Sequence, residues 1–128
     1  MNKRQINPWT WQEPMGFSQA WRVDDAAAVV FLAGQGPLDD DGALIAGDFE
    51  EQVRQTFRNL RTVLEAAGAS LDAIVHLRAY LTDVTKVRDY GRVRVEFITG
   101  AAPAGTVVGV TGLAVPGMQV EVEAAAVV

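Results

Sequence analysis

Few side chains in this sequence could carry out covalent or acid–base chemistry. The chain has no cysteine, which excludes a thiol nucleophile, a zinc–thiolate site and a disulfide framework. His76 is the only histidine, so a pair of catalytic histidines, as in a ribonuclease, is excluded too. We interpret this lone histidine as a surface or interface residue. The groups that remain for binding a small anion are individual arginines.

Arg78 is the first of these arginines to consider. It lies in residues 73–81, AIVHLRAYL, which alternate as a strand does, with His76 and Tyr80 on the same face. A cation in this position could bind an anionic ligand. The alternative is that Arg78 forms an ion pair with an acidic residue of a nearby strand, such as Glu121 or Glu123.

The segment 101–110, AAPAGTVVGV, is a second place where a ligand could bind. It passes from a proline turn directly into an apolar, β-branched strand, and such a junction often directs a side chain into a pocket. The residue at the junction is Gly105, which has no side chain. Only the backbone N–H groups of Gly105 and Thr106 could hydrogen-bond a ligand oxygen there.

The composition describes an acidic, globular chain of one domain. Of its 128 residues, 49% are hydrophobic and 21% are charged, and the net charge is -5 with a pI near 4.7. A protein that binds nucleic acid non-specifically needs a basic surface, so we expect no nucleic-acid partner. Lys3 and Arg4 are followed by no apolar run, and no segment approaches the length of a membrane helix. These features predict a cytoplasmic protein without a membrane partner.

A helix after Asp48 is the element that the sequence predicts most clearly. Asp48 can cap the first turn, and Glu51 stands three residues later, as in a capping box. Gly68 is a natural stop. One apolar face follows helical spacing: Phe49, Val53, Phe57, Leu60 and Leu64.

The remaining elements are mostly strands. Residues 17–23 and 28–32 are predicted to form an N-terminal β-hairpin, and 73–81, 106–113 and 118–128 to form three further strands. Residues 85–100 fit both a helical stripe and a strand-like alternation, so their pattern leaves the element open. The basic run Arg88, Arg92 and Arg94 is interpreted as a solvated face.

The predicted element order is β-β-α-β-α-β-β, an α+β fold. Both helices would cover one face of a single mixed sheet in one domain, 1–128, with residues 1–16 as an extended N-terminal arm. Residues 120–128 are apolar on much of both faces, which favours subunits that pack sheet to sheet. Trp9 and Trp11 in the arm are interpreted as a contact with a neighbouring subunit, or as a cover over a binding cleft.

Six short segments, in order along nearly the whole chain, resemble a known family. They are GQGPL (34–38), EQVRQ (51–55), NL (59–60), LEAAGASL (64–71), LTD (81–83) and VEVEA (120–124). On these segments the chain resembles the reactive intermediate deaminase (Rid) family, also called the YjgF or L-PSP endoribonuclease-like family. The resemblance also favours a helix for residues 85–100.

The resemblance implies a chorismate-mutase-like subunit and a homotrimer with small-molecule clefts between its subunits. It implies hydrolysis of reactive enamines and imines to keto acids and ammonia, with no metal and no organic cofactor. Some relatives were described as ribonucleases; here the net charge and the missing histidine pair argue against that activity. The rival hypothesis is a non-catalytic metabolite-binding or regulatory trimer.

The resemblance also implies which residues line the cleft. Glu121 stands where a glutamate positions or polarises the attacking water, and Gln35 is retained as well. Gly105 stands at the place of the arginine that pairs with the substrate carboxylate, beside Thr106. Phe17 replaces a tyrosine of the family.

Two further substitutions complete this set. Ala33 replaces a serine or threonine, and Gly91 an asparagine. The implied cleft is roomier and more apolar, and it lacks the usual carboxylate clamp, for which Arg78 is the best replacement. The sequence therefore predicts binding of a small organic metabolite with enamine or imine chemistry, whereas ordinary 2-imino acid deamination is doubtful.

Overall fold

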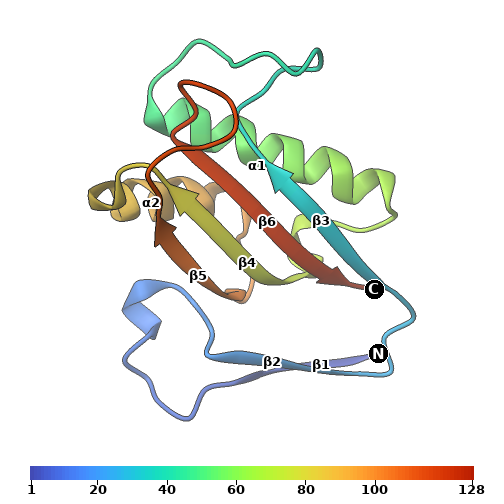
Figure 1. The fold of residues 1–128 in the computed structure, drawn as a ribbon. Helices are drawn as coiled ribbons and strands as arrows, with labels where there is room; N and C mark the ends of the chain where they lie inside the picture. The colour runs from blue at the N-terminus through green and yellow to red at the C-terminus, as the bar shows by residue number, and fades with distance from the viewer.

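Two helices lie on one face of a four-stranded sheet, and a separate two-stranded sheet runs past one end of it (Figure 1). The structure, a computed structural model, describes residues 1–128. In chain order the elements are β1 (Asn2–Ile6), the 3₁₀ turn η1 (Glu13–Met15), β2 (Ala20–Asp24), β3 (Val29–Gln35), α1 (Phe49–Ala66), η2 (Leu71–Ala73), β4 (Ile74–Leu81), η3 (Val84–Lys86), α2 (Val87–Phe97), β5 (Ala104–Gly109) and β6 (Val120–Val127).

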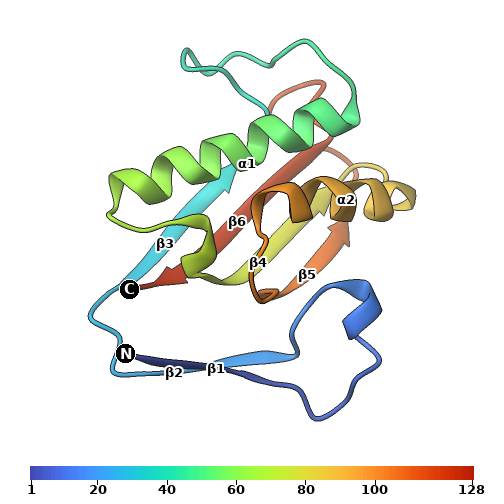
Figure 2. The same cartoon turned by 180° about the vertical axis from the view of Figure 1, so that it is seen from behind.

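The larger sheet is mixed, as predicted, with the strand order β3-β6-β4-β5. β4 and β5 are parallel, whereas β6 is antiparallel to both β3 and β4. A parallel pair needs a crossover connection, and here α2 provides it. The α+β class with two helices on one face is thus confirmed, and Figure 2 shows both helices in front of the sheet.

The prediction of one single sheet with an N-terminal hairpin from residues 17–23 and 28–32 is wrong. β2 pairs antiparallel with β1, and β3 pairs with β6 instead. Asp25 adopts a positive φ of 58° directly after β2, where the chain turns away from the small sheet. Alternation identified two strands but not their partners, because pairing depends on which apolar faces meet. Residues 1–16, predicted as an extended arm, contain β1 and η1.

α1 begins and packs as its sequence predicts. The Asp48 carboxylate accepts a hydrogen bond of 3.0 Å from the N–H of Glu51. The Glu51 side chain does not complete a capping box but pairs with Arg54 at 2.8 Å. The apolar stripe is buried against the sheet and α2, with Val53, Phe57, Leu60 and Leu64 fully enclosed.

α2 resolves the ambiguity of residues 85–100 in favour of the helix that the resemblance implied. Tyr90 and Val93 are the buried residues of this helix. The Phe57 ring of α1 packs against Tyr90 and Phe97, with ring centroids 6.0 and 5.6 Å apart. A strand would turn alternate residues of this segment away from α1, so packing of one helical stripe decides the element.

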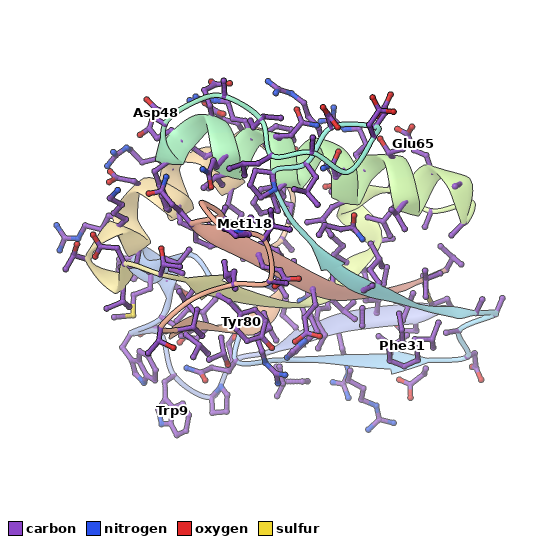
Figure 3. The ribbon with its side chains drawn as sticks, turned by 45° about the horizontal axis from the view of Figure 1, so that its top comes forward. Trp9, Phe31, Asp48, Glu65, Tyr80 and Met118 are labelled. Atoms are coloured by element: carbon purple, nitrogen blue, oxygen red, sulfur yellow. The ribbon has the colours of Figure 1, made fainter.

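The two faces of the sheet differ in what covers them. Val120, Val122, Ala124 and Ala126 of β6 are buried under the helices. On the other face Phe31 is 82% exposed, and Figure 3 shows it together with Tyr80 on the side away from α1. This second face has no covering element within the chain.

Hydrogen bonds join the small sheet and the residues before it to the start of β5. Ser18 donates a backbone hydrogen bond of 3.1 Å to the carbonyl of Pro103. The Ser18 hydroxyl and the Trp21 indole N–H both donate to the carbonyl of Ala102, at 2.5 and 3.0 Å. These contacts place residues 15–17 beside β5 and α2. Neither helix is long and apolar enough to cross a membrane.

Candidate functional site

A pocket with a cavity of about 140 Å³ lies between α2 and the edge strand β5. α2 forms one wall and residues 103–107 of β5 form another, while residues 15–17 close one end. Most of the lining is apolar or glycine. Its members are Met15, Gly16, Phe17, Leu77, Val87, Tyr90, Gly91, Arg94, Pro103, Ala104, Gly105, Thr106 and Val107.

Gly105 lines this pocket, but its position admits no side chain. A Cβ atom built on Gly105 would lie 1.8 Å from the carbonyl oxygen of Leu77 and 2.9 Å from its carbonyl carbon. Both atoms belong to the backbone of β4, so the strand itself would have to move. Glycine therefore has a structural role in β5, and a single substitution cannot place an arginine here without distorting the sheet.

Arg94 contributes the guanidinium group that lines the pocket. Its Nη2 donates a hydrogen bond of 2.6 Å to the carbonyl oxygen of Gly16. The interpretation of Arg94 as part of a solvated face is thus wrong, although Arg88 and Arg92 are exposed. The sequence held a signal for this: Val87, Tyr90 and Arg94 share one helical stripe, so Arg94 had to face the interior side of α2.

Tyr90 places a phenol beside this guanidinium. The residue is only 4% exposed, and its hydroxyl makes no hydrogen bond within the chain. Burial raises the pKa of Tyr90, and the nearby charge of Arg94 opposes part of that effect. Tyr90 therefore stays protonated and presents a neutral hydrogen-bonding group to the pocket.

An aromatic cluster extends outward from the pocket at Phe17. Trp11 packs edge-on against Phe17 with centroids 5.9 Å apart, and Trp9 stacks on Trp11 at 6.2 Å. Both tryptophans remain more than half exposed, and Figure 3 shows Trp9 projecting from the molecule. Their contact with a neighbouring subunit or with a ligand stays a prediction.

A second group of predicted site residues lies toward the edge of the sheet opposite β5, where β3 and β6 pair. Glu121 is half-buried, and its carboxylate lies so close to Gly34 that a Cβ there would be 2.5 Å from Oε1. Gln35 donates to the carbonyl of Ala33 at 3.2 Å and lines a second, mostly non-hydrophobic pocket with Asn59. Ala33, Gln35 and Glu121 are thus brought together.

Within one chain these two groups of residues do not meet. Tyr80 of β4 is opposite Glu121, whereas Leu77 is opposite Gly105. Three residues along a strand correspond to about 10 Å, and two strand spacings add about 10 Å in the perpendicular direction. Glu121 and Gly105 therefore belong to separate halves of any common site.

Arg78 lies outside the pocket, on the sheet face away from the helices. It forms an ion pair of 3.4 Å with Glu123, and the Tyr80 hydroxyl donates a short hydrogen bond to the same carboxylate. The Tyr80 hydroxyl and then the charge of Glu123 raise the pKa of Arg78. Within the chain the arrangement matches the ion-pair alternative. His76 is half-buried on this face, and no group of three or more potential metal ligands is present.

Comparisons with known proteins agree on one family. Residues 11–128 match the family described as Endoribonuclease L-PSP. The chain is 35% identical over 103 residues to a RutC family protein of Pyrococcus abyssi, covering 79% of each chain. It is 34% identical to YyfB of the Rid family from Yersinia pestis, a protein of unknown function, with a TM-score of 0.87 and full coverage of both chains. RidA from an Antarctic Psychrobacter has 32% identity and a TM-score of 0.74, with 88% of each chain covered.

Proposed function

This chain belongs to the Endoribonuclease L-PSP family, also known as Rid, YjgF or RutC, and we propose that it binds a small metabolite in clefts between the subunits of a homotrimer. Its reaction is the hydrolysis or tautomerisation of an enamine or imine. The observation that carries the proposal is the division of the predicted site into two halves within one chain.

The first half is the pocket, with Phe17, Gly105 and Thr106, at the β5 edge of the sheet. The second half is the group around Glu121 at the β3–β6 pair. A cleft that contains both halves requires a second copy, which brings its own β3–β6 surface to the β5 edge of the first.

The uncovered sheet face provides the surface for that association. Val29 is 53% exposed and Phe31 is 82% exposed, although both belong to the apolar first half of β3. Burying such side chains contributes about 1.5–3 kcal/mol each. Sheet-to-sheet packing of three copies would cover this face and join the two halves of three sites.

The proposed chemistry uses Glu121 as a general base. Its carboxylate accepts a proton from water while the water oxygen bonds to the imine carbon and the imine nitrogen takes a proton from solvent, which gives a carbinolamine. The protonated Glu121 then returns its proton to the amine nitrogen. The C–N bond breaks, ammonia leaves, and the hydroxyl loses its proton to solvent to give the ketone. An enamine first gains a proton on carbon and loses one from nitrogen, which converts it to the imine. The N–H groups of Gly105 and Thr106 hydrogen-bond an oxygen of the substrate.

Gly105 takes the place of the arginine that the family uses for the substrate carboxylate. A charge-assisted pair contributes about 1.5–3 kcal/mol, so ordinary 2-imino acids held only through that position would bind poorly. We expect the preferred substrate to be an enamine or imine that does not depend on a carboxylate contact at residue 105.

The test is ammonia release from freshly generated 2-imino acids and from bulkier enamines. Glu121→Gln should lower the rate by at least about a hundredfold, the usual contribution of a general base. Glu123→Gln is the matched control, since it removes a carboxylate two residues along the same strand and should leave the rate within a few-fold. Equal losses in both variants would exclude the assigned role of Glu121.

Assembly is tested separately by light scattering. The trimer predicts a mass of three chains at micromolar concentration, and Phe31→Glu should dissociate it and abolish turnover. A monomeric wild-type protein would remove the intersubunit cleft from the proposal.

A non-catalytic metabolite-binding trimer is the second candidate. It is favoured by the mostly apolar and glycine lining of the pocket, which offers few groups for proton transfer. Ligand binding that survives Glu121→Gln, with no ammonia release from any substrate, would establish this alternative. Endoribonuclease activity, which the family's name implies, is disfavoured by the net charge of -5.

A further inference from the structure

We propose that Arg94 is the specificity-determining residue of the pocket between α2 and β5, and that it selects small carboxylates with an apolar body. The inference rests on the proposed function in taking this pocket as one half of the ligand cleft. It adds the chemical class of the ligand and the residue that recognises it.

The first observation is that Arg94 has no carboxylate partner. Arg22, Arg54, Arg78 and Arg92 each form an ion pair within the chain. Among the arginines without an ion pair, Arg94 alone is not exposed; the others are Arg4, Arg58, Arg61 and Arg88. A half-buried guanidinium that lacks a counter-charge favours binding of an anion from outside the chain.

The second observation is that most donors of Arg94 remain available. A guanidinium has five N–H groups, and the one hydrogen bond of Arg94 within the chain goes to the Gly16 carbonyl. The planar fork of the remaining groups matches the two oxygens of a carboxylate. The Tyr90 hydroxyl lies in the same lining and can donate to a third site on the ligand.

The third observation is that the chain turns so that Arg94 can approach it closely. Gly16 has a φ of 77°, in the left-handed region that favours glycine. A Cβ on Gly16 would lie 2.7 Å from Nη2 of Arg94. Glycine at this position thus permits both the turn and the close contact, which fixes the guanidinium at the end of the pocket.

The rest of the lining determines the body of the ligand. Leu77, Val87 and Val107 supply apolar walls, Phe17 supplies an aromatic edge, and no acidic residue lines the cavity. A dicarboxylate or a phosphosugar would leave charged or polar groups against these walls without partners. One carboxylate on a small apolar body satisfies both Arg94 and the walls.

The experiment compares benzoate with its neutral isostere benzamide, by calorimetry or chemical-shift titration on the full-length protein. Wild type should bind benzoate at least tenfold more tightly than benzamide. Arg94→Gln should weaken benzoate by about ten- to a hundredfold, as expected for loss of a charge-assisted pair. Its affinity for benzamide should change by less than about twofold.

The matched control is Arg88→Gln, which removes the same charge from an exposed position of the same helix. It should leave both affinities unchanged. Arg94→Lys keeps the charge but loses the planar fork, so it should fall between wild type and Arg94→Gln. Thermal unfolding of each variant verifies that it is folded, and Tyr90→Phe gives a second, isosteric change in the same pocket.

Two results would overturn the inference: an unchanged benzoate-to-benzamide ratio in Arg94→Gln, or an equal loss of benzoate binding in Arg88→Gln. The outcome is separable from the proposed function. If the protein releases ammonia but the benzoate-to-benzamide ratio is unchanged in Arg94→Gln, only the role of Arg94 is overturned. Absence of turnover on every substrate would end the catalytic proposal while an Arg94-dependent ratio still supports this one.

Discussion

The two helices lie side by side on the same face of the sheet, yet they use their polar groups differently (Figure 2). In α1, Asp48 caps the first turn and Arg54 pairs with Glu51 and Glu96. Gln52, although 3% exposed, is bonded to the carbonyl of Gly117 and the N–H of Gln119. The polar residues of α1 thus reinforce the fold.

α2 instead leaves groups unpaired on the side that faces β5. Its first turn has no side-chain cap, Gly91 interrupts its stripe, and Arg94 and Tyr90 keep free donors. A helix that only supports a fold gains from pairing such groups. The difference teaches that α1 stabilises the fold, whereas α2 forms one wall of the pocket beside β5.

The largest expected effect comes from Phe57→Ala, because the Phe57 side chain joins the two helices. Phe57 is fully buried and contacts both Tyr90 and Phe97. We expect a loss of about 3–5 kcal/mol in the free energy of unfolding, from lost burial and the cavity left behind. Chemical denaturation measures it. Val63→Ala, at a 37% exposed position of α1, should cost far less; similar costs would mean that Phe57 does not hold α2 in place.

Gly105→Ala tests the strand that faces α2. The added Cβ would collide with the Leu77 backbone, so we expect destabilisation of about 1–3 kcal/mol, as for other overpacked sites. Gly112→Ala is the control, since nothing lies within 4 Å of its Cβ position. Equal melting temperatures for the two variants would show that β5 can move to admit a side chain.

Asp48→Ala tests whether α1 depends on its cap. Loss of the acceptor for the Glu51 N–H should cost about 1 kcal/mol, measured by denaturation. Asp48→Ser keeps an acceptor oxygen and should recover most of the stability. Binding of benzoate should not change in either variant, because α1 does not line the pocket.

Gly91→Ala should have the smallest effect on stability, and it distinguishes most clearly between the roles of the two helices. Alanine should stabilise α2 by about 0.5–1 kcal/mol, since the Cβ meets no atom within 4 Å. The same methyl group enters the pocket, so ligand affinity should fall while the melting temperature rises. Val95→Ala, on the exposed side of α2, should leave affinity unchanged. Unchanged affinity in Gly91→Ala would show that this part of the pocket is not used.

Local patterns predicted the elements well where one physical signal dominated. The α1 stripe and the Asp48 cap were read correctly because both depend on residues within a few positions of one another. The order and spacing of six short segments along the chain indicated the family, and the comparisons confirm it. By contrast, strand partners were assigned incorrectly, since pairing joins residues far apart in the chain.

The sequence by itself determined the α+β class, the helix α1, the family and the absence of a side chain at residue 105. Each follows from residue identity and short-range periodicity. Only the tertiary structure decided that Gly105 lies too close to Leu77 for any side chain, and that Arg94 enters the pocket beside Tyr90. The distance between the β4 and β5 backbones is set by packing of elements that are distant in the chain. The same packing determines which side of α2 faces the pocket.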